Sequence, residues 1–250
     1  MELGVYSGCI VGETLEDQLN ALRELGYDFL ELRLTNDEID ALDEGQIASI
    51  AKLAESTGMP IRSASVGQMT KLAELCADEG AREATRSRLM RVVKLCRRLE
   101  ANVILLATKE EVPVEDALPA YSAGLARWAD AAQEQGVCFA LEHVGGYKPS
   151  EIEAIVRGVG HPGVGMYFDI GNALGAGEDH VECIQSMGDI MAAVHFKGRG
   201  DMPLRDMRLD EVRTGLAEHG YSGRGAVEIG GEGNNDHLRE ALAVLREFGL

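Results

Sequence analysis

The chain has 250 residues, of which 45% are hydrophobic and 26% are charged, a composition typical of a globular protein with a large core. Its 42 acidic residues outnumber its 24 basic residues and give a formal net charge of -18, which repels nucleic acid and anionic membrane surfaces. The sequence contains no run near the roughly 20 apolar residues that span a bilayer, and its first residues do not resemble a signal peptide. We therefore expect no nucleic-acid partner, no membrane partner and a cytoplasmic location.

The cysteines are few and scattered. There are five, with no C-x-x-C pair among them, which argues against a disulfide framework and against a thiolate zinc site. We expect them to be reduced and to serve mainly in packing. They are Cys9, Cys76, Cys96, Cys138 and Cys183.

Short apolar runs rich in β-branched residues recur along the chain and predict eight strands. Several are almost continuously apolar, as in Val103–Leu106, which favours parallel strands covered on both faces. Eight parallel strands are the number that closes a (β/α)8 barrel, and about 250 residues is the usual length of that fold. The predicted strands are Glu2–Tyr6, Asp28–Leu32, Ile61–Val66, Asn102–Ala107, Val137–Glu142, Val164–Asp169, Ala192–Phe196 and Ala226–Ile229.

Helical patterns fill the segments between these strands. The first begins after a plausible N-cap at Thr14 and ends at Gly26, and the second begins at Asp43 and ends at Gly58. The long connection Gly67–Arg82 is expected to lie over the barrel mouth as a lid. Further helices are predicted at Ala84–Leu99, Glu115–Gln135, Ser150–Val156, His180–Met187, Asp210–His219 and Asn235–Phe248.

The alternation of strand and helix, without a change of composition, predicts a single domain over residues 1–250. An open doubly wound sheet is the competing fold, and it would place a G-x-G-x-x-G turn after the first strand. The turn at Ser7–Gly12 lacks that pattern. The sequence therefore favours an α/β fold of the TIM-barrel type, with eight parallel strands and outer helices.

Each of the last four predicted strands carries, near its C-terminal end, a side chain that can bind a metal ion. These side chains follow one another at intervals of 27, 26 and 33 residues, each the length of one strand–helix unit. The C-terminal ends of barrel strands converge on the mouth, so we expect the four to meet there. They are Glu142, Asp169, His195 and Glu228.

Three carboxylates crowded at one place raise one another's pKa unless a cation lies between them. Three oxygen ligands and one imidazole, with no thiolate, favour one divalent ion, Mn²⁺ first, with Mg²⁺, Co²⁺ and the less favoured Zn²⁺ as alternatives. Taken singly, a Glu at a strand end is more often a solvated loop residue, and a His in an apolar strand is more often a bonded core residue. Four such residues at equivalent positions of successive strands favour a metal site.

Around these residues the chain resembles the xylose isomerase-like barrel family of sugar-phosphate isomerases and epimerases. That family includes ketose 3-epimerases, hydroxypyruvate isomerases and inosose dehydratases. The resemblance covers most of the chain but identifies no substrate. The matching segments are Ala140–Glu142, Tyr167–Asn172, Val194–Lys197 and Gly220–Gly223, the last leading into Val227 and Glu228.

The resemblance implies catalytic roles for Glu142 and Glu228, which would bind the metal and also exchange the substrate proton. A metal that polarises the oxygens of a ketose acidifies the adjacent C–H and stabilises a cis-enediolate. The function implied is a metal-dependent isomerase or epimerase of a small keto-sugar or polyol. The chain departs from the pattern at Asn172, where several epimerases carry His, and in the segments His143–Tyr147 and Asp201–Asp206.

Further residues near the strand ends are candidates for substrate contact. Lys197 shares the inward face with His195, and Arg199 follows it, so both could meet a carboxylate or phosphate, although salt bridges to the acidic mouth explain them equally well. Glu31 is a candidate for hydroxyl groups, with an internal ion pair to Arg33 as the alternative. His143 and Asn172 are candidates for hydroxyl contacts or for supporting the ligands.

Other readings of the same site stay open. An inosose dehydratase-type lyase would use the same enolate to expel a β-hydroxyl group, and a non-catalytic barrel would bind a metabolite without converting it. An apurinic-site nuclease with a trinuclear zinc cluster is disfavoured by the net charge and because His161, His219 and His237 fall away from the expected mouth. Related barrels often form dimers or tetramers, so a homo-oligomer is compatible with the sequence, which does not specify the oligomeric state.

Overall fold

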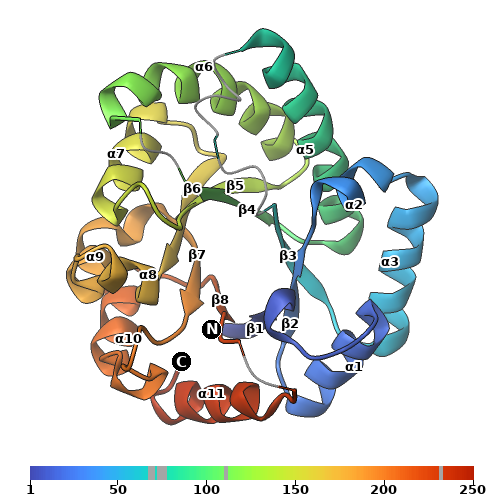
Figure 1. The fold of residues 1–250 in the computed structure, drawn as a ribbon, viewed down its shortest axis with the longest axis vertical. Coiled ribbons are helices and arrows are strands. Elements are labelled where there is room, and N and C mark those ends of the chain that lie inside the picture. The colour runs from blue at the N-terminus through green and yellow to red at the C-terminus, as the bar shows by residue number, and fades with distance from the viewer. Residues whose placement is uncertain (67–70, 72–77, 110–111, 231–232) are drawn as a thin grey trace.

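The computed structural model of the chain is a closed barrel in which β1 to β8 pair in sequential order, each parallel to its neighbours, and β1 pairs with β8 (Figure 1). This confirms the predicted (β/α)8 architecture. The structure describes residues 1–66, 71, 78–109, 112–230 and 233–250. The strands are β1 (Glu2–Tyr6), β2 (Phe29–Arg33), β3 (Ile61–Ser65), β4 (Val103–Thr108), β5 (Cys138–His143), β6 (Val164–Asp169), β7 (Met191–Phe196) and β8 (Arg224–Val227).

All eight predicted strands are present, with bounds shifted by at most two residues. The largest shift is in β8, which ends at Val227 rather than at Ile229, so that Glu228 directly follows the strand. The backbone N–H of Glu228 still donates to the carbonyl of Phe196 at 3.1 Å. Glu228 is therefore held in register with β7 although it lies outside the strand.

The helices surround the barrel, as Figure 1 shows. The short α2 and α8 were not predicted, and α5 begins at Glu79 rather than at Ala84, because Asp78 accepts a hydrogen bond from the N–H of Ala81 and caps it there. Residues 67–70 and 72–77 of the predicted lid lie outside the described residues. The helices are α1 (Leu15–Leu25), α2 (Asn36–Ala41), α3 (Glu44–Thr57), α5 (Glu79–Leu99), α6 (Val114–Gln133), α7 (Pro149–Val159), α8 (Ile170–Gly175), α9 (His180–Met187), α10 (Leu209–Glu218) and α11 (Asp236–Glu247).

Local sequence signals account for the helix ends. The hydroxyl oxygen of Thr14 accepts from the N–H of Asp17, whose carboxylate accepts from the N–H of Thr14, a capping box that starts α1. Gly26 ends the same helix in the left-handed region at φ 85°. At Asp43 only half of such a box forms, since the carboxylate accepts from the N–H of Gln46 without a reciprocal bond.

The core has two parts. A large cluster of buried side chains lies between the sheet and the helices, and includes Trp128 and Tyr121 of α6. A smaller cluster fills the barrel interior with inward-facing side chains of β4 to β7, among them Leu105 and Tyr167. The barrel is thus a packed core on which the strand ends are held in place.

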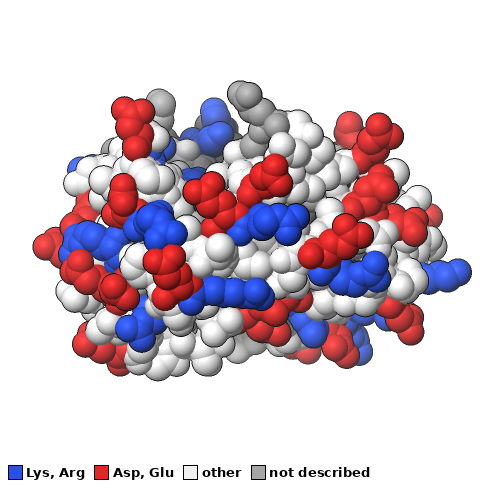
Figure 2. All heavy atoms as spheres, turned by 90° about the horizontal axis from the view of Figure 1, so that it is seen from below, with Lys and Arg blue, Asp and Glu red and all other residues white. Residues whose placement is uncertain are grey.

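The surface mixes charges of both signs. On the face shown in Figure 2, blue and red side chains are interspersed, as expected for a chain with 24 basic and 42 acidic residues. Among the described helices, none combines the length and the hydropathy that a membrane span requires. The four cysteines within the described residues, Cys9, Cys96, Cys138 and Cys183, are free thiols, as predicted.

Close packing between β7 and β8 gives a test of the fold near the site. A Cβ atom at Gly225 would collide with the fully buried ring of Phe196, whose neighbour in sequence is His195. We expect Gly225→Ala to lower the free energy of unfolding by about 1–3 kcal/mol, the usual cost of overpacking a core. Urea denaturation measures this change.

Gly230→Ala is the matched control, because no described atom lies within 4 Å of a Cβ atom built at that position. Its free energy of unfolding should stay near that of the wild type. Equal stability of both variants would contradict the packing described between the last two strands.

Candidate metal centre at the barrel mouth

The structure brings the four predicted ligands together. Each offers one ligand atom, and these atoms all lie within 4.8 Å of one another. Glu142, Asp169 and His195 are buried on β5, β6 and β7, and Glu228, immediately after β8, is a quarter exposed. Register places Asp169 directly opposite His195. Four successive strand ends therefore form one arc around a common point.

Asp169 is fixed by the start of a helix. It is the N-cap of α8, and its Oδ1 accepts from the N–H of Asn172 at 2.7 Å. The other oxygen, Oδ2, faces the cluster and lies 3.7 Å from Nδ1 of His195. A Cβ at Gly171 would lie 2.7 Å from the side chain of Lys197, so glycine lets α8 approach β7 closely. The cap thus leaves one carboxylate oxygen for the site.

His195 has a defined orientation. Its Nδ1 lies 3.0 Å from Oε1 of Glu142 and 3.5 Å from Oε2 of Glu228, while its Nε2 lies 2.8 Å from Oε1 of Glu31. Burial by itself lowers the pKa of His195, but Glu31 and Glu142 together raise it well above its usual value. Nδ1 is therefore the ring nitrogen that faces the other ligands.

Lys197 places a cation inside the cluster. Its Nζ lies 2.8 Å from Oδ2 of Asp169 and 2.6 Å from Oε2 of Glu228. Burial by itself lowers the pKa of Lys197, but these two carboxylates raise it. Of the two roles open for this residue, substrate contact or a salt bridge to the acidic mouth, the structure displays the salt bridge.

The carboxylates have different electrostatic environments. Burial raises the pKa of Glu142 to about 7 in spite of the nearby His195, and burial also raises the pKa of Asp169. Burial raises the pKa of Glu228 as well, but His195 and Lys197 outweigh it and leave that pKa below its usual value. Such crowding of acidic groups is relieved by positive charge, here from His195 and Lys197.

The donor set fits a divalent cation. Three carboxylates and one imidazole nitrogen converge without a thiolate, a combination that suits hard to borderline ions. Among the described residues no other group of His, Cys, Asp or Glu is gathered in this way, so the further ligands that a trinuclear zinc nuclease would need are not seen there. Glu142, Asp169, His195 and Glu228 could hold one ion, provided that the ammonium of Lys197 moves aside.

The side chain of Glu31 lies in the barrel interior and is not exposed to solvent. It is fully buried on β2, its carboxylate accepts from Ser63 and Tyr167, and its Oε1 lies 2.8 Å from Nε2 of His195. The alternative of an internal ion pair with Arg33 does not form either, since Arg33 is exposed and none of these bonds involves it. Glu31 therefore contacts His195 from inside the barrel, and its contact with a substrate stays a prediction.

His143 and Asn172 form one contact outside the barrel. Because side chains alternate along β5, His143 points away from Glu142 and packs against the ring of Phe168 at 5.6 Å. Burial lowers its pKa to about 3, so the ring is neutral. Asn172 donates through Nδ2 to the carbonyl oxygen of His143. Contact of His143 or Asn172 with a substrate stays a prediction.

Arg199 is exposed on the loop after β7. Its guanidinium lies against Gly175 at the end of α8, and its backbone exchanges two hydrogen bonds with Met202. Within the described residues its side chain forms no ion pair. Contact between Arg199 and a substrate stays a prediction.

Several residues close to the site were not predicted. Tyr6 at the end of β1 lies edge-on to His195, with ring centroids 6.1 Å apart, and Tyr167 lies 4.4 Å from His195 on β6. Ser63 completes the bonds to Glu31. Tyr167 precedes Asp169 by two residues, so period-two alternation would have identified it as inward-facing.

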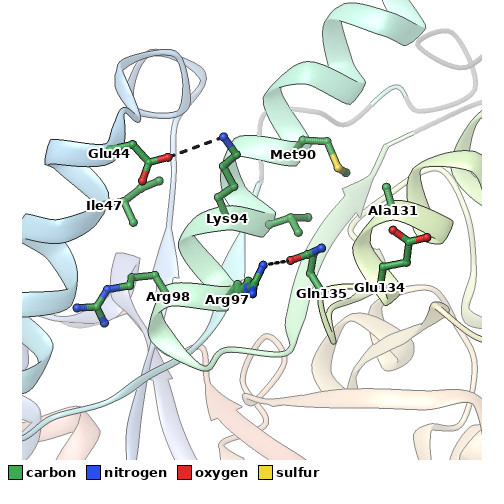
Figure 3. Close-up of a pocket in the computed structure, with 10 residues that line it drawn as sticks. Glu44, Ile47, Met90, Lys94, Arg97, Arg98, Ala131, Glu134 and Gln135 are labelled. Atoms are coloured by element: carbon green, nitrogen blue, oxygen red, sulfur yellow. Dashed lines mark hydrogen bonds and ion pairs between the residues drawn. The ribbon is translucent and has the colours of Figure 1, made fainter.

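Two cavities differ in their relation to the cluster. One of about 770 Å³ lies on the outer helices α3, α5 and α6, where Lys94 pairs with Glu44 and Arg97 with Gln135 (Figure 3). None of the four candidate ligands lines it. The other, of about 420 Å³, lies between the loop after β7 and α11 and is lined by Lys197, Glu228 and His237 as well as apolar residues.

His237 was predicted to be structural and distant from the mouth, like His161 and His219. All three bond within the protein: His237 to the carbonyl of Cys9, His219 to that of Gln185, and His161 to Asp130. What differs from the prediction is the location of His237 relative to the barrel mouth. It stands at the start of α11, which begins near the strand ends, and it lines the same cavity as Glu228.

Comparison with known families matches residues 19–248 to the model of the xylose isomerase-like TIM barrel. The chain belongs to the xylose isomerase-like TIM barrel family. None of the curated proteins matches it. Among solved structures it is similar to 3-keto-D-glucoside 4-epimerase from E. coli, with a TM-score of 0.80, 16% identity and coverage of 99% of both chains.

Two further solved structures are also similar to the chain. D-psicose 3-epimerase from Clostridium cellulolyticum H10, solved with D-tagatose, has a TM-score of 0.75 and 17% identity over 100% of this chain and 98% of that one. The IOLI protein, solved with a zinc atom, has a TM-score of 0.72 and 18% identity over 100% and 96%. At these identities the likeness shows the shared fold alone.

The position of Lys197 gives a test of the centre. We expect Lys197→Met to bind a divalent ion at least about 10-fold more tightly than the wild type, because the competing ammonium is removed; at an effective dielectric constant near 20, unit charges 4 Å apart interact by about 4 kcal/mol. The metal-free variant should be less stable, since Asp169 loses its cation. Isothermal titration with Mn²⁺ and thermal unfolding measure the two effects.

Arg199→Met is the matched control, because it removes the same charge from the same loop, whereas among the described residues the cation paired with Asp169 and Glu228 is Lys197. Its affinity for Mn²⁺ should stay close to that of the wild type. A Lys197→Met protein with unchanged or weaker affinity would show that the lysine does not compete with the ion.

Proposed function

We propose that the protein is a divalent-metal-dependent isomerase or epimerase of a small keto-sugar or polyol. The observation that carries this proposal is the arrangement of the two glutamates. Glu142 and Glu228 stand at the two ends of the arc from β5 to the end of β8, and Asp169 and His195 lie between them. Two carboxylates can thus approach one small substrate from different sides.

A divalent ion at this place, with Mn²⁺ favoured by the donor set, would polarise a substrate carbonyl and the adjacent hydroxyl and make the C–H bond beside them acidic. One glutamate would then take the proton; the electron pair of the broken C–H bond becomes the carbon–carbon π bond, and the π pair of the carbonyl moves onto its oxygen to give a cis-enediolate. The second glutamate returns a proton from the other face, which inverts the carbon in an epimerase. Return of the proton to the neighbouring carbon gives an isomerase.

The surroundings of the centre support a small carbohydrate substrate. The cavity of about 420 Å³ beside Glu228 is of the size of ordinary ligand sites and has apolar walls that include Met202, Leu204 and Ile229. Lys197, which lines this cavity, would once displaced by the ion lie within reach of an anionic or hydroxyl group. The sugar epimerases among the structural neighbours support the reaction class but, at 16 and 17% identity, do not identify the substrate.

Proton exchange with solvent tests this proposal. We expect the protein with Mn²⁺ to incorporate deuterium beside the carbonyl when it is incubated with a panel of ketoses in D₂O, as followed by NMR. Glu142→Gln and Glu228→Gln should each reduce the rate by about 10²- to 10⁴-fold, the usual contribution of a positioned acid or base. Metal content is measured for each variant, so that loss of the ion is told apart from loss of the proton carrier.

Glu218→Gln, an exposed change of the same kind on α10, should leave exchange unchanged. A wild-type protein that binds Mn²⁺ but exchanges no proton with any ketose would contradict the proposal and favour the non-catalytic alternative. Exchange accompanied by the ultraviolet absorbance of a conjugated enone would identify a lyase of the inosose dehydratase type. A cytoplasmic location and assembly into a homo-oligomer stay predictions.

A further inference from the structure

A buried carboxylate lies directly behind the imidazole of the metal centre. Glu31 of β2 is fully buried, and its Oε1 lies 2.8 Å from Nε2 of His195. The opposite ring nitrogen, Nδ1, faces Glu142, Asp169 and Glu228. His195 therefore separates Glu31 from the other three carboxylates, and each side of the ring meets acidic groups.

The second oxygen of Glu31 is held by two hydroxyl groups. Its Oε2 accepts from the phenol of Tyr167 at 2.6 Å and from the hydroxyl of Ser63 at 2.8 Å. Three donors from β3, β6 and β7 therefore converge on one carboxylate, which fixes its position and leaves Oε1 for His195. An anionic carboxylate can only accept, so Nε2 must carry the proton of this bond.

The imidazole is also restrained in rotation. The ring of Tyr167 lies 4.4 Å from that of His195 at 51°, and the ring of Tyr6 lies 6.1 Å away at 62°. These neighbours oppose a flip of the imidazole that would exchange its two nitrogens. The tautomer that is set by Glu31 is therefore the tautomer presented to the cluster.

We infer that Glu31 is the positioning residue of the metal centre: it keeps a proton of His195 on Nε2, so that Nδ1 is the nitrogen that releases its proton to solvent and offers its lone pair to the ion. The inference rests on the proposed metal site and deepens it. Carboxylates that accept from a ligating histidine fix its tautomer and raise its basicity, and their loss commonly weakens metal binding by 10- to 100-fold. Glu31 itself touches neither ion nor substrate.

The amide variant Glu31→Gln reverses the hydrogen bond to His195 without changing the shape of the side chain. Ser63 and Tyr167 bond no other acceptor in the described structure, so they hold the amide oxygen and turn the amide nitrogen toward Nε2. Nε2 must then accept, and the proton moves to Nδ1, where it opposes the ion. A histidine locked in the wrong tautomer by an amide is a known cause of large losses in function.

Isothermal titration with Mn²⁺ is the first measurement. Glu31→Gln should bind 10- to 100-fold more weakly than the wild type. Ser63→Ala is the matched control, because it removes a donor to Oε2 but leaves the bond between Oε1 and Nε2, and it should lose far less affinity. If the wild type binds no ion, the proposed function fails; if the wild type and Glu31→Gln bind equally well, only the role of Glu31 is overturned.

A second measurement does not depend on the folding of a variant. Long-range ¹H–¹⁵N NMR of the wild-type protein loaded with diamagnetic Zn²⁺ reports which nitrogen of His195 carries the proton, with its signals identified as those of the imidazole that shift when Zn²⁺ is added. We expect a protonated Nε2 and a metal-bound Nδ1. The opposite assignment would overturn the inference.

Removal of the hydroxyl groups of Ser63 and Tyr167 from the Glu31→Gln protein should partly restore its affinity for Mn²⁺. In the triple variant Glu31→Gln, Ser63→Ala, Tyr167→Phe, the amide oxygen is free to turn toward Nε2, and part of the lost affinity for Mn²⁺ should return. Binding as weak as that of Glu31→Gln, in a triple variant whose circular dichroism shows the native fold, would contradict control through the tautomer.

Discussion

The pair of contacts that His195 makes with Glu31 and Glu142 is the interaction on which the rest of the site depends. Both contacts are buried, at 2.8 and 3.0 Å, and they join β2, β5 and β7 through the barrel interior. Closed pairing of eight strands brings these elements together and excludes water from the ring. The fold thus determines which nitrogen of the imidazole faces the other ligands, and this orientation defines the chemistry of the centre.

The charges at the mouth are balanced within the chain. Four acidic side chains, Glu31, Glu142, Asp169 and Glu228, meet His195 and Lys197 in a protein whose formal net charge is -18. Lys197 holds two of the ligand carboxylates together in the described structure, and an incoming divalent ion would take over that role. Under the proposed function, the same lysine would then be available at the mouth to contact a substrate.

Much of this site could be predicted from the sequence because it depends on periodicity. The recurrence of strand and helix indicated the barrel, and the equal placement of Glu142, Asp169, His195 and Glu228 at successive strand ends indicated their convergence. The sequence was less informative about features that depend on the exact ends of the strands. Glu228 lies just outside β8 and not within it. The six-residue α8 was not predicted because it follows β6 directly, with the last strand residue Asp169 as its N-cap, so that no connecting segment marks its start.

The support around the ligands could not be predicted from local patterns. Ser63, Tyr167 and Glu31 come from three strands, and whether their side chains meet depends on strand tilt and on the closure of the barrel. For the same reason Glu31 could not be told from a residue that contacts substrate, and His143 could not be assigned to the outer face before the phase of β5 was known. The alternation of side chains along a strand predicts which residues face the barrel interior. It predicts neither how deeply a residue is buried nor which residues it contacts.

The central claim is that one divalent ion binds among the four strand-end residues. Anomalous X-ray diffraction from crystals of the protein soaked in Mn²⁺ tests it most directly. The account predicts a single strong anomalous peak within bonding distance of Glu142, Asp169, Glu228 and Nδ1 of His195, with the ammonium of Lys197 moved away from Asp169. A map without a peak at this place, in which Lys197 still bridges Asp169 and Glu228, would contradict it.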